Sequence, residues 1–291
     1  MPETLLDPTL APRLEQLSLA LRRPHRGDGR GDRRSLRRGT SLEFADFRPY
    51  AVGDDLRHVD WNAYARSDHL FVKLYEEEER FLVHFILDVS RSMDWGSANK
   101  LAFALRLVAA LGYVGLVGNS RLLVTLADRG FVRSHGPVWG RREVRGLIAF
   151  LESVQPSGET DLAAALRSAR WQGRVALTVL ISDLLTPTWQ EGLRVLSSHG
   201  GEAVVLHTLA PEELEPPPGN DLRLVDRETG HEVNITLSRE ARDLYRRRLT
   251  QWLAEIEEQC GAYGLRYLRV SSDADLAGVL FHQLRARGVV R

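Results

Sequence analysis

The sequence is short of the features that mark several classes of protein. It contains a single cysteine, Cys260, among 291 residues, so an internal disulfide is excluded. Basic and acidic residues balance at 39 each, which leaves no net charge to attract nucleic acid or anionic lipid. An apolar fraction of 43% with 27% charged residues is typical of a globular chain of one large domain or two small ones.

Export and membrane signals are also missing from the sequence. The opening stretch, MPETLLDPTLAPRLEQ, lacks the charged leader, apolar run and cleavage site of a secretory signal. The longest apolar stretch, residues 101–118, is interrupted by Arg106 and is short for a membrane span. We therefore expect a soluble cytoplasmic protein with no direct membrane span. The P-loop motif and the G-x-S-x-G elbow are absent too, which argues against those nucleotide-binding and serine hydrolase sites.

Strands and helices are predicted to alternate from residue 80 onward. Continuous apolar runs predict strands buried on both faces at residues 80–90 and 175–182. The other predicted strands are 121–126, 130–134, 202–209 and 265–270, and the predicted helices are 97–118, 139–154, 161–170, 188–199 and 238–261, with a final helix near the end. Strands separated by helices predict an α/β fold with a mostly parallel central sheet and helices on both faces.

Two domains are predicted: an N-terminal leader at residues 1–79 and the α/β domain at residues 80–291, which includes a small β-hairpin turning at 228–230. The leader begins with an amphipathic helix at residues 8–21. Residues 22–39 follow with eight Arg and two Asp. This stretch lacks the interleaved aromatic residues on which single-stranded nucleic acids stack, so an acidic protein partner is favoured over nucleic acid.

Oxygen-bearing side chains follow the two buried strands. Asp88, Ser90 and Ser92 come at the end of the first strand, and Asp183 follows the second. Thr160 stands where a helix begins between them. Because ligands bind at the carboxyl ends of parallel strands where the strand order reverses, we expect these side chains to meet.

The chemistry of this expected site indicates a hard cation. Hydroxyl and carboxylate oxygens, without thiol or imidazole, favour Mg²⁺, Mn²⁺ or Ca²⁺ over zinc or copper. Two carboxylates around one dication leave the site nearly neutral and open to a carboxylate from a partner. A plainer interpretation is helix capping, by Ser92 or Asp94 for the helix that follows and by Asp161 for its own helix.

Two family resemblances support the metal site. The pattern of Asp88, Ser90 and Ser92 with Thr160 and Asp183 resembles the metal-ion-dependent adhesion site of von Willebrand factor type A domains. That resemblance implies hydroxyl ligands from the two serines and Thr160, with both aspartates acting directly or through water.

The second resemblance lies upstream and is more specific. The stretch resembles the signature of the bacterial family catalogued as domain of unknown function fifty-eight, through Glu43-Phe44, Arg48-x-Tyr50, Gly53-Asp54, Arg57 and Asp60-Trp61 to Ala65-Arg66. Together the two resemblances cover residues 38–185. They imply a type A fold and frequent pairing with MoxR-type AAA+ ATPases.

The upstream signature has two interpretations. Its mixed charges predict an ion-pair network that ties the leader to the main domain. Alternatively, Arg48, Arg57, Trp61, Tyr64 and Arg66 form a partner-binding surface, since Trp, Tyr and Arg are enriched in binding hot spots.

Two functions of different classes follow from the sequence. The first is a non-enzymatic binding module whose metal site engages a MoxR-type AAA+ ATPase or its client in the assembly or activation of other proteins. The second is a metal-dependent, phosphatase-like hydrolase that uses Asp88 and Asp183. Ser90 weakens the second hypothesis, because a carboxylate at that position could serve as general acid and a hydroxyl does not.

Overall fold

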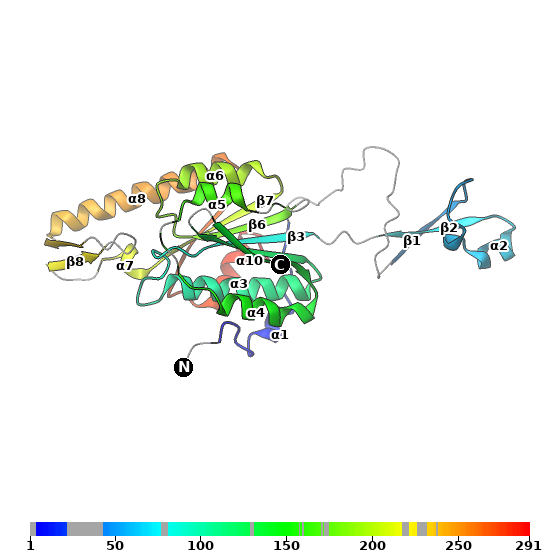
Figure 1. Ribbon diagram of the computed structural model, residues 1–291, viewed down its shortest axis with the longest axis horizontal. Coiled ribbons are helices and arrows are strands. Elements are labelled where there is room, and N and C mark those ends of the chain that lie inside the picture. Colours follow the sequence, from blue (N-terminus) through cyan, green and yellow to red (C-terminus); the bar gives the residue numbers. More distant parts are fainter. Residues whose placement is uncertain are drawn as a thin grey trace. The chain divides into compact units, whose positions relative to one another are not determined.

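The computed structural model (Figure 1) describes residues 4–21, 43–76, 81–128, 131–156, 158, 160–169, 171, 175–216, 221–225, 232–236 and 238–291. The chain forms two compact units. The first, here called the α/β unit, contains Met1–His25 and Phe81–Arg291, and the second, the small unit, contains Arg26–Arg80. The arginine-rich stretch at 22–39 and the predicted hairpin turn at 228–230 lie outside the described residues.

A six-stranded sheet forms the centre of the α/β unit, with the strand order β10-β7-β6-β3-β4-β5. The strands are β3 (Leu82–Asp88), β4 (Arg121–Asp128), β5 (Phe131–Trp139), β6 (Val175–Ser182), β7 (Glu202–Leu209) and β10 (Arg266–Ser271). All neighbouring pairs are parallel except β4 and β5, which run antiparallel. The predicted α/β fold with a mostly parallel central sheet is therefore confirmed.

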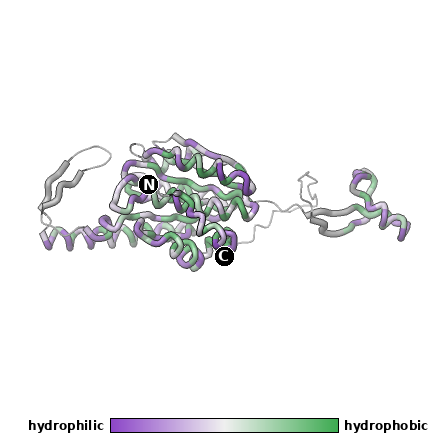
Figure 2. The backbone as a smooth tube through the Cα atoms, turned by 90° about the horizontal axis from the view of Figure 1, so that it is seen from below, coloured by the Kyte–Doolittle hydropathy of each residue, from purple (hydrophilic) through white to green (hydrophobic). Residues whose placement is uncertain are grey.

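Helices cover both faces of this sheet (Figure 1). One face carries α1 (Ala11–Leu14), α3 (Lys100–Val117), a short 3₁₀ turn η2 (Arg141–Glu143), α4 (Val144–Glu152) and the C-terminal run of α9 (Leu276–Gly278), η3 (Val279–Gln283) and α10 (Leu284–Ala286). The other face carries α5 (Leu162–Ser168), α6 (Trp189–Ser198) and α8 (Arg239–Ala262). Figure 2 shows that apolar residues concentrate in this layered interior.

The helix α3 is the most apolar helix of the α/β unit. It is the one helix among the described residues that is long and apolar enough to cross a membrane. Of its residues, 78% are buried against the sheet and neighbouring helices, which is the pattern of a core helix.

The order of the strands reverses between β3 and β6. From β3 the chain passes through α3, on one face of the sheet, to β4. On the other side of β3 lies β6, and the chain leaves β6 through α6 on the opposite face. The two connections diverge, so the carboxyl ends of β3 and β6 meet at an edge that no crossing helix covers. This edge is where the sequence places Asp88 and Asp183.

A short helix and a β-hairpin follow β7 in the sequence. The short helix α7 (Pro211–Leu214) follows β7, and β8 (Asp221–Val225) pairs antiparallel with β9 (Glu232–Thr236) to form the predicted hairpin. The sequence did not predict α7, which is only one turn long.

The N-terminal segment differs from its prediction. Instead of a helix over 8–21, only Ala11–Leu14 is α-helical, and Leu19 then pairs antiparallel with Val290 near the C-terminus. Leu14 and Leu17 are buried in the same core as α3. The predicted boundary at residue 79 is therefore wrong for the first 25 residues, because their apolar side chains and backbone hydrogen bonds belong to the α/β unit.

The small unit is built around an antiparallel pair of strands. β1 (Glu43–Pro49) pairs with β2 (Phe71–Glu76), and η1 (Leu56–His58) and α2 (Trp61–Ser67) connect them. Asp60 begins α2 as its N-cap, accepting hydrogen bonds from the backbone of Asn62 and Ala63 at 2.9 and 3.1 Å. The alternation of residues Leu70 to Tyr75 in the sequence predicts a strand that matches β2, but neither β1 nor α2 was predicted.

Candidate functional site: the carboxyl edge between β3 and β6

Asp88 joins the ends of the two central strands. It is the last residue of β3 and is only 2% exposed. Its Oδ1 accepts a hydrogen bond from the backbone N–H of Ser90 at 3.0 Å, and its Oδ2 accepts one from the hydroxyl of Ser182 at 2.6 Å. Ser182 ends β6, so the sequence was right to place these strand ends together.

The two serines after Asp88 point their hydroxyls at each other. The chain turns after Ser90, whose carbonyl accepts from the backbone N–H of Met93 at 3.1 Å. The Oγ atoms of Ser90 and Ser92 are 2.9 Å apart and share a hydrogen bond. The turn therefore converts an extended D-x-S-x-S stretch into a cluster of oxygens.

Thr160 lies against the same strand ends. It is 6% exposed, and its hydroxyl lies 3.5 Å from the carbonyl of Ala127, the residue that pairs with Asp88 across β3 and β4. Its own carbonyl accepts from the hydroxyl of Thr186, in the loop after β6, at 2.8 Å. The third predicted loop is thus tied to the other two.

The capping interpretation is settled separately for each residue. The N-cap of α3 is Asn99, whose side chain accepts from the first turn at 2.9 Å, so capping by Ser92 or Asp94 was wrong. Asp94 instead accepts from the Asn99 amide at 2.7 Å. Asp161 does cap α5, as expected.

Asp183 has a partner that the sequence did not predict. Its Oδ2 lies 2.7 Å from Nζ of Lys100, and its Oδ1 accepts from the backbone N–H of Leu185 at 3.1 Å. Lys100 and Asp183 are both buried, at 0% and 1% side-chain exposure. The signal was present in the sequence, because a lysine in the first turn of an apolar helix opposes the helix dipole and needs a carboxylate nearby.

Lys100 also reaches a second carboxylate. Its Nζ lies 2.6 Å from Oε1 of Glu213 in α7, and the other oxygen of Glu213 accepts from the backbone N–H of Ala210 at 2.7 Å. Burial would lower the pKa of Lys100, but the charges of Asp183 and Glu213 outweigh burial and raise it. Burial raises the pKa of Glu213 against the pull of Lys100.

A buried histidine supports the backbone of Asp183. The Asp183 carbonyl can only accept, so the Nε2–H of His207 donates to it at 2.8 Å, and Nδ1 accepts from the hydroxyl of Tyr267 at 2.8 Å. The next residue, Leu184, is fully buried with φ of 55°, a conformation rare for leucine. The loop after β6 is therefore held in one fixed shape.

The donor set suits a hard cation. Within the described part of the chain, no three His, Cys, Asp or Glu side chains gather as metal ligands, so a cation here depends on the hydroxyls of Ser90, Ser92 and Thr160. No ion pair reaches Asp88 among the described residues. Burial raises the pKa of Asp88, and the charge of Asp183 raises it further, against the hydrogen bonds from Ser182 and Ser90. A buried carboxylate in this state is stabilised by a cation.

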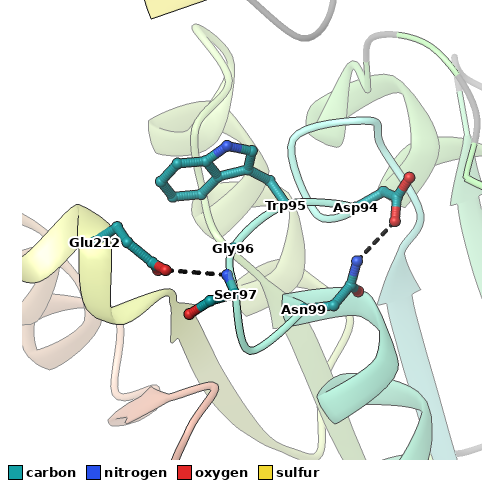
Figure 3. A pocket seen from close by; sticks show the side chains of 6 residues that line it. All are labelled: Asp94, Trp95, Gly96, Ser97, Asn99 and Glu212. Carbon is teal, nitrogen blue, oxygen red and sulfur yellow. Dashed lines mark hydrogen bonds between the residues drawn. The ribbon is translucent and has the colours of Figure 1, made fainter. Parts of the chain in front are cut away.

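A shallow cleft of about 450 Å³ opens beside these loops (Figure 3). Its lining consists of Asp94, Trp95, Gly96, Ser97, Asn99 and Glu212. Glu212 comes from α7 and accepts from the backbone N–H of Ser97 at 3.0 Å, so α7 forms one wall and residues 94–99, which follow the D-x-S-x-S stretch, form the other.

The charged residues of the upstream signature pair within the small unit. Arg48 binds Asp54 with two hydrogen bonds of 2.5 and 2.7 Å, and this contact lowers the pKa of Asp54 to about 2. Arg57 pairs with Asp55 at 2.8 Å. Both pairs are local, so the described contacts give an ion-pair network inside the unit.

The aromatic residues of the signature remain on the surface of the small unit. Trp61 is 56% and Tyr64 40% exposed, with their rings edge to face at 6.3 Å between centroids. Arg66, two residues on, is exposed as well. Their role in partner binding stays a prediction.

Known relatives resemble the chain over nearly its whole length. An uncharacterized protein of Mycobacterium tuberculosis, Rv1480, is 28% identical over 293 residues, covering 98% of this chain and 92% of the relative. Among solved structures, the conserved hypothetical protein BatB of Bacteroides thetaiotaomicron aligns with a TM-score of 0.44 at 18% identity, covering 71% of this chain and 98% of that one. An aerotolerance-related membrane protein of Bacteroides fragilis aligns with a TM-score of 0.41 at 22% identity, covering 70% and 99%.

The family assignment comes from the match to a family model. The model described as "Protein of unknown function DUF58" matches residues 46–254, which span most of the small unit and the α/β unit as far as α8. The resemblance in the upstream signature pointed to the same family. The chain therefore belongs to the DUF58 family.

Proposed function

We propose that this protein is a non-enzymatic binding module that engages a partner protein through a divalent cation, Mg²⁺ by default or Mn²⁺ or Ca²⁺, at the carboxyl edge of its sheet. The observation that carries the proposal is that Asp88, the paired hydroxyls of Ser90 and Ser92, and Thr160, whose hydroxyl lies against the β4 neighbour of Asp88, all lie at the edge where the strand order reverses. This edge combines hard oxygen donors with a buried carboxylate that lacks a cation among the described residues.

Each residue at this edge has a separate role in holding the ion. The three hydroxyls and Asp88 hold the ion, while Asp183, already paired with Lys100, contributes charge through water. Neutral hydroxyl ligands leave positive charge on a bound ion, and this charge anchors a carboxylate of the partner. Lys100 and the hydrogen bonds around Asp183 keep the loops in place for that contact.

The partner class follows from the family resemblance. We propose a MoxR-type AAA+ ATPase, or its client, as the protein that supplies the carboxylate. The exposed pair of Trp61 and Tyr64, with Arg66, is a second contact surface consistent with binding hot spots. Arg48 and Arg57 support that surface through their ion pairs.

The proposal is tested by direct binding of the purified chain to the MoxR-type ATPase encoded in the same genome, followed by biolayer interferometry. Ser92→Ala removes one hydroxyl ligand and is expected to weaken binding about tenfold or more. Asp88→Ala is expected to abolish the binding.

The control for this experiment lies in the same loop. Ser97 is exposed, and its backbone N–H, which Ser97→Ala keeps, donates to Glu212, so this variant is expected to keep the loop and bind normally. An AAA+ ATPase itself uses Mg²⁺ with its nucleotide, so a chelator would remove that ion as well as the cation of the proposed site. The test therefore compares variants of this chain instead of adding a chelator. Equal affinity of wild type, Ser92→Ala and Asp88→Ala would rule the metal-dependent contact out.

One observation favours the alternative hydrolase. Lys100, distant in sequence, does lie beside Asp183, where a cation could face a phosphate. Against it, both oxygens of Asp88 already accept hydrogen bonds, and Lys100 is held by two carboxylates. Turnover of p-nitrophenyl phosphate that survives repurification and disappears in Asp88→Asn would establish the hydrolase in place of the binding module.

A further inference from the structure

Lys100 is the charged centre of the carboxyl edge. Its side chain is fully buried, and its ammonium lies 2.7 Å from Asp183 and 2.6 Å from Glu213. Burying a lysine is unfavourable unless carboxylates surround it, and its place in the first turn of α3 adds the unfavourable dipole of the helix. Burial and the helix dipole both oppose the charge of Lys100, so the charge is stable only through its carboxylate neighbours and acts strongly on them in return.

The charges at this edge do not balance. The ammonium contacts two carboxylates, those of Asp183 and Glu213, and a third, that of Asp88, is buried within electrostatic reach of Asp183. In their ionised forms these four groups carry a net charge of −2. A divalent cation would bring the sum to zero. The ammonium and such a cation carry the same sign and share Asp183, so each weakens the hold of the other.

We propose that Lys100 sets the affinity of the site by competing with the divalent cation for Asp183, while Glu213 retains the ammonium when the cation binds. The idea rests on the metal site of the proposed function and adds its regulation. Because Asp183 is shared with Lys100, the ion is held weakly until a partner carboxylate adds a further negative ligand. Metal capture and partner capture are then coupled, each strengthening the other by the same factor.

The arrangement of Glu213 supports its role in retaining the lysine. Its Oε2 is fixed by the backbone of Ala210, and its carbonyl accepts from the hydroxyl of Tyr245 in α8 at 2.6 Å. The carboxylate is thus fixed by the N-cap residue of α7 and the backbone of Glu213 is tied to α8, both independently of Asp183. If the ammonium loses Asp183 to a cation, Glu213 remains as its counter-charge.

The competition predicts opposite effects for the two partners of one ion pair. Lys100→Met removes the competing charge and is expected to tighten Mg²⁺ binding about tenfold or more. Glu213→Gln leaves the ammonium to Asp183 alone and is expected to weaken Mg²⁺ binding by a similar factor. The double variant K100M/E213Q loses one charge of each sign and is expected to fall between the two.

The experiment is isothermal titration of the full chain with MgCl₂ and with MnCl₂, wild type beside the three variants. Arg266→Met is the matched control, because Arg266 is a buried cation paired with Glu202 at the opposite edge of the sheet. Its loss is expected to leave Mg²⁺ affinity unchanged. Circular dichroism and thermal unfolding establish that each variant is folded.

The outcomes separate the two proposals. Tighter binding in Lys100→Met with weaker binding in Glu213→Gln supports the competition, and a merely structural lysine would weaken binding in both. Wild-type binding that Lys100→Met leaves unchanged or weaker overturns the role of Lys100 and leaves the metal site standing. Absence of binding in wild type and all variants overturns the metal site itself. If Lys100→Met does not fold, the changes in Mg²⁺ affinity of Glu213→Gln and the double variant decide. Weaker binding in Glu213→Gln that the double variant partly restores supports the competition, and any other result overturns it.

Discussion

Two buried ion pairs stand at opposite edges of the same sheet and are balanced differently. At the amino edge, Arg266 at the start of β10 meets Glu202 at the start of β7 at 2.9 Å and also donates to the Gly288 carbonyl at 2.6 Å. At the carboxyl edge, Lys100 meets two carboxylates with Asp88 nearby. The described contacts of Arg266 tie the starts of two strands and the Gly288 backbone together, whereas those of Lys100 gather carboxylates around one ammonium, where we propose that a further cation binds.

Breaking each pair gives the largest expected effect. Arg266→Met and Lys100→Met, measured in chelator, are each expected to lose about 3–5 kcal/mol of unfolding free energy, because each removes the cation of a buried ion pair. Added Mg²⁺ is expected to restore part of the loss only for Lys100→Met. Urea unfolding with EDTA and with Mg²⁺ measures both, and an equal response of the two variants to Mg²⁺ would erase the distinction between the edges.

Two buried histidines make the unfolding free energy depend on pH, and only one of them contacts the carboxyl edge. Burial lowers the pKa of His84, which bonds Thr125 in the sheet, and of His207, which bonds Asp183, to about 4 in each case. Since the unfolded pKa is near 6.5, both contribute stability that is complete above pH 6.5 and is lost as the pH falls toward 4. The loss is expected to be on the order of 3 kcal/mol for each histidine.

Urea unfolding between pH 7.5 and pH 4 measures this loss. His84→Leu and His207→Leu are each expected to flatten the pH dependence. Only His207→Leu is expected to weaken Mg²⁺ binding as well, because the Asp183 carbonyl loses its donor. A steep acid dependence that survives in both variants would mean that other groups cause it.

Neutralising the unpaired carboxylate gives a smaller change of opposite sign. Asp88→Asn keeps the shape of the side chain, and its amide can still bond Ser90 and Ser182, so in chelator the unfolding free energy is expected to rise by about 1 kcal/mol. The same variant is expected to lose any rise in Tm caused by Mg²⁺. Destabilisation in chelator would show that Asp88 has a compensating cation after all.

The exposed pairs of the small unit give the smallest effect. Arg57 is 72% exposed on its side chain, so Arg57→Ala is expected to leave the urea midpoint unchanged within error. Trp61→Ala is likewise expected to leave stability almost unchanged but to weaken binding of the partner ATPase. A Trp61→Ala chain that binds as well as wild type would remove this surface from the proposed contact.

The sequence predicted the centre of the fold better than its edges. β6 and β7 begin and end where the apolar runs predicted, because strands covered on both faces are continuously apolar. β5 extends to Trp139, beyond the predicted residue 134, since Gly136 and Pro137 break the pattern of an edge strand without ending it. β1 and α2 were missed because the small unit has little apolar periodicity.

The site was predicted only as far as local patterns reach. Asp88, Ser90 and Ser92 lie within one pentapeptide, and the strand-end rule brought Asp183 to them. Lys100 is separated from Asp183 by 83 residues and from Glu213 by 113, so only the folded chain shows the contact. The order of the strands, which determines that contact, is a property of the whole sheet.

The chain leaves the α/β unit at His25 and returns to it at Phe81, which makes the small unit an insertion. An excision that joins residue 25 to residue 81 through a flexible linker keeps Leu14, Leu17 and Leu19 in their core, and the β-type contact of Leu19 with Val290 continues to close the chain. A simple truncation before Phe81 strips those leucines away. An excision within the chain therefore removes the small unit and leaves every strand of the six-stranded sheet in the sequence.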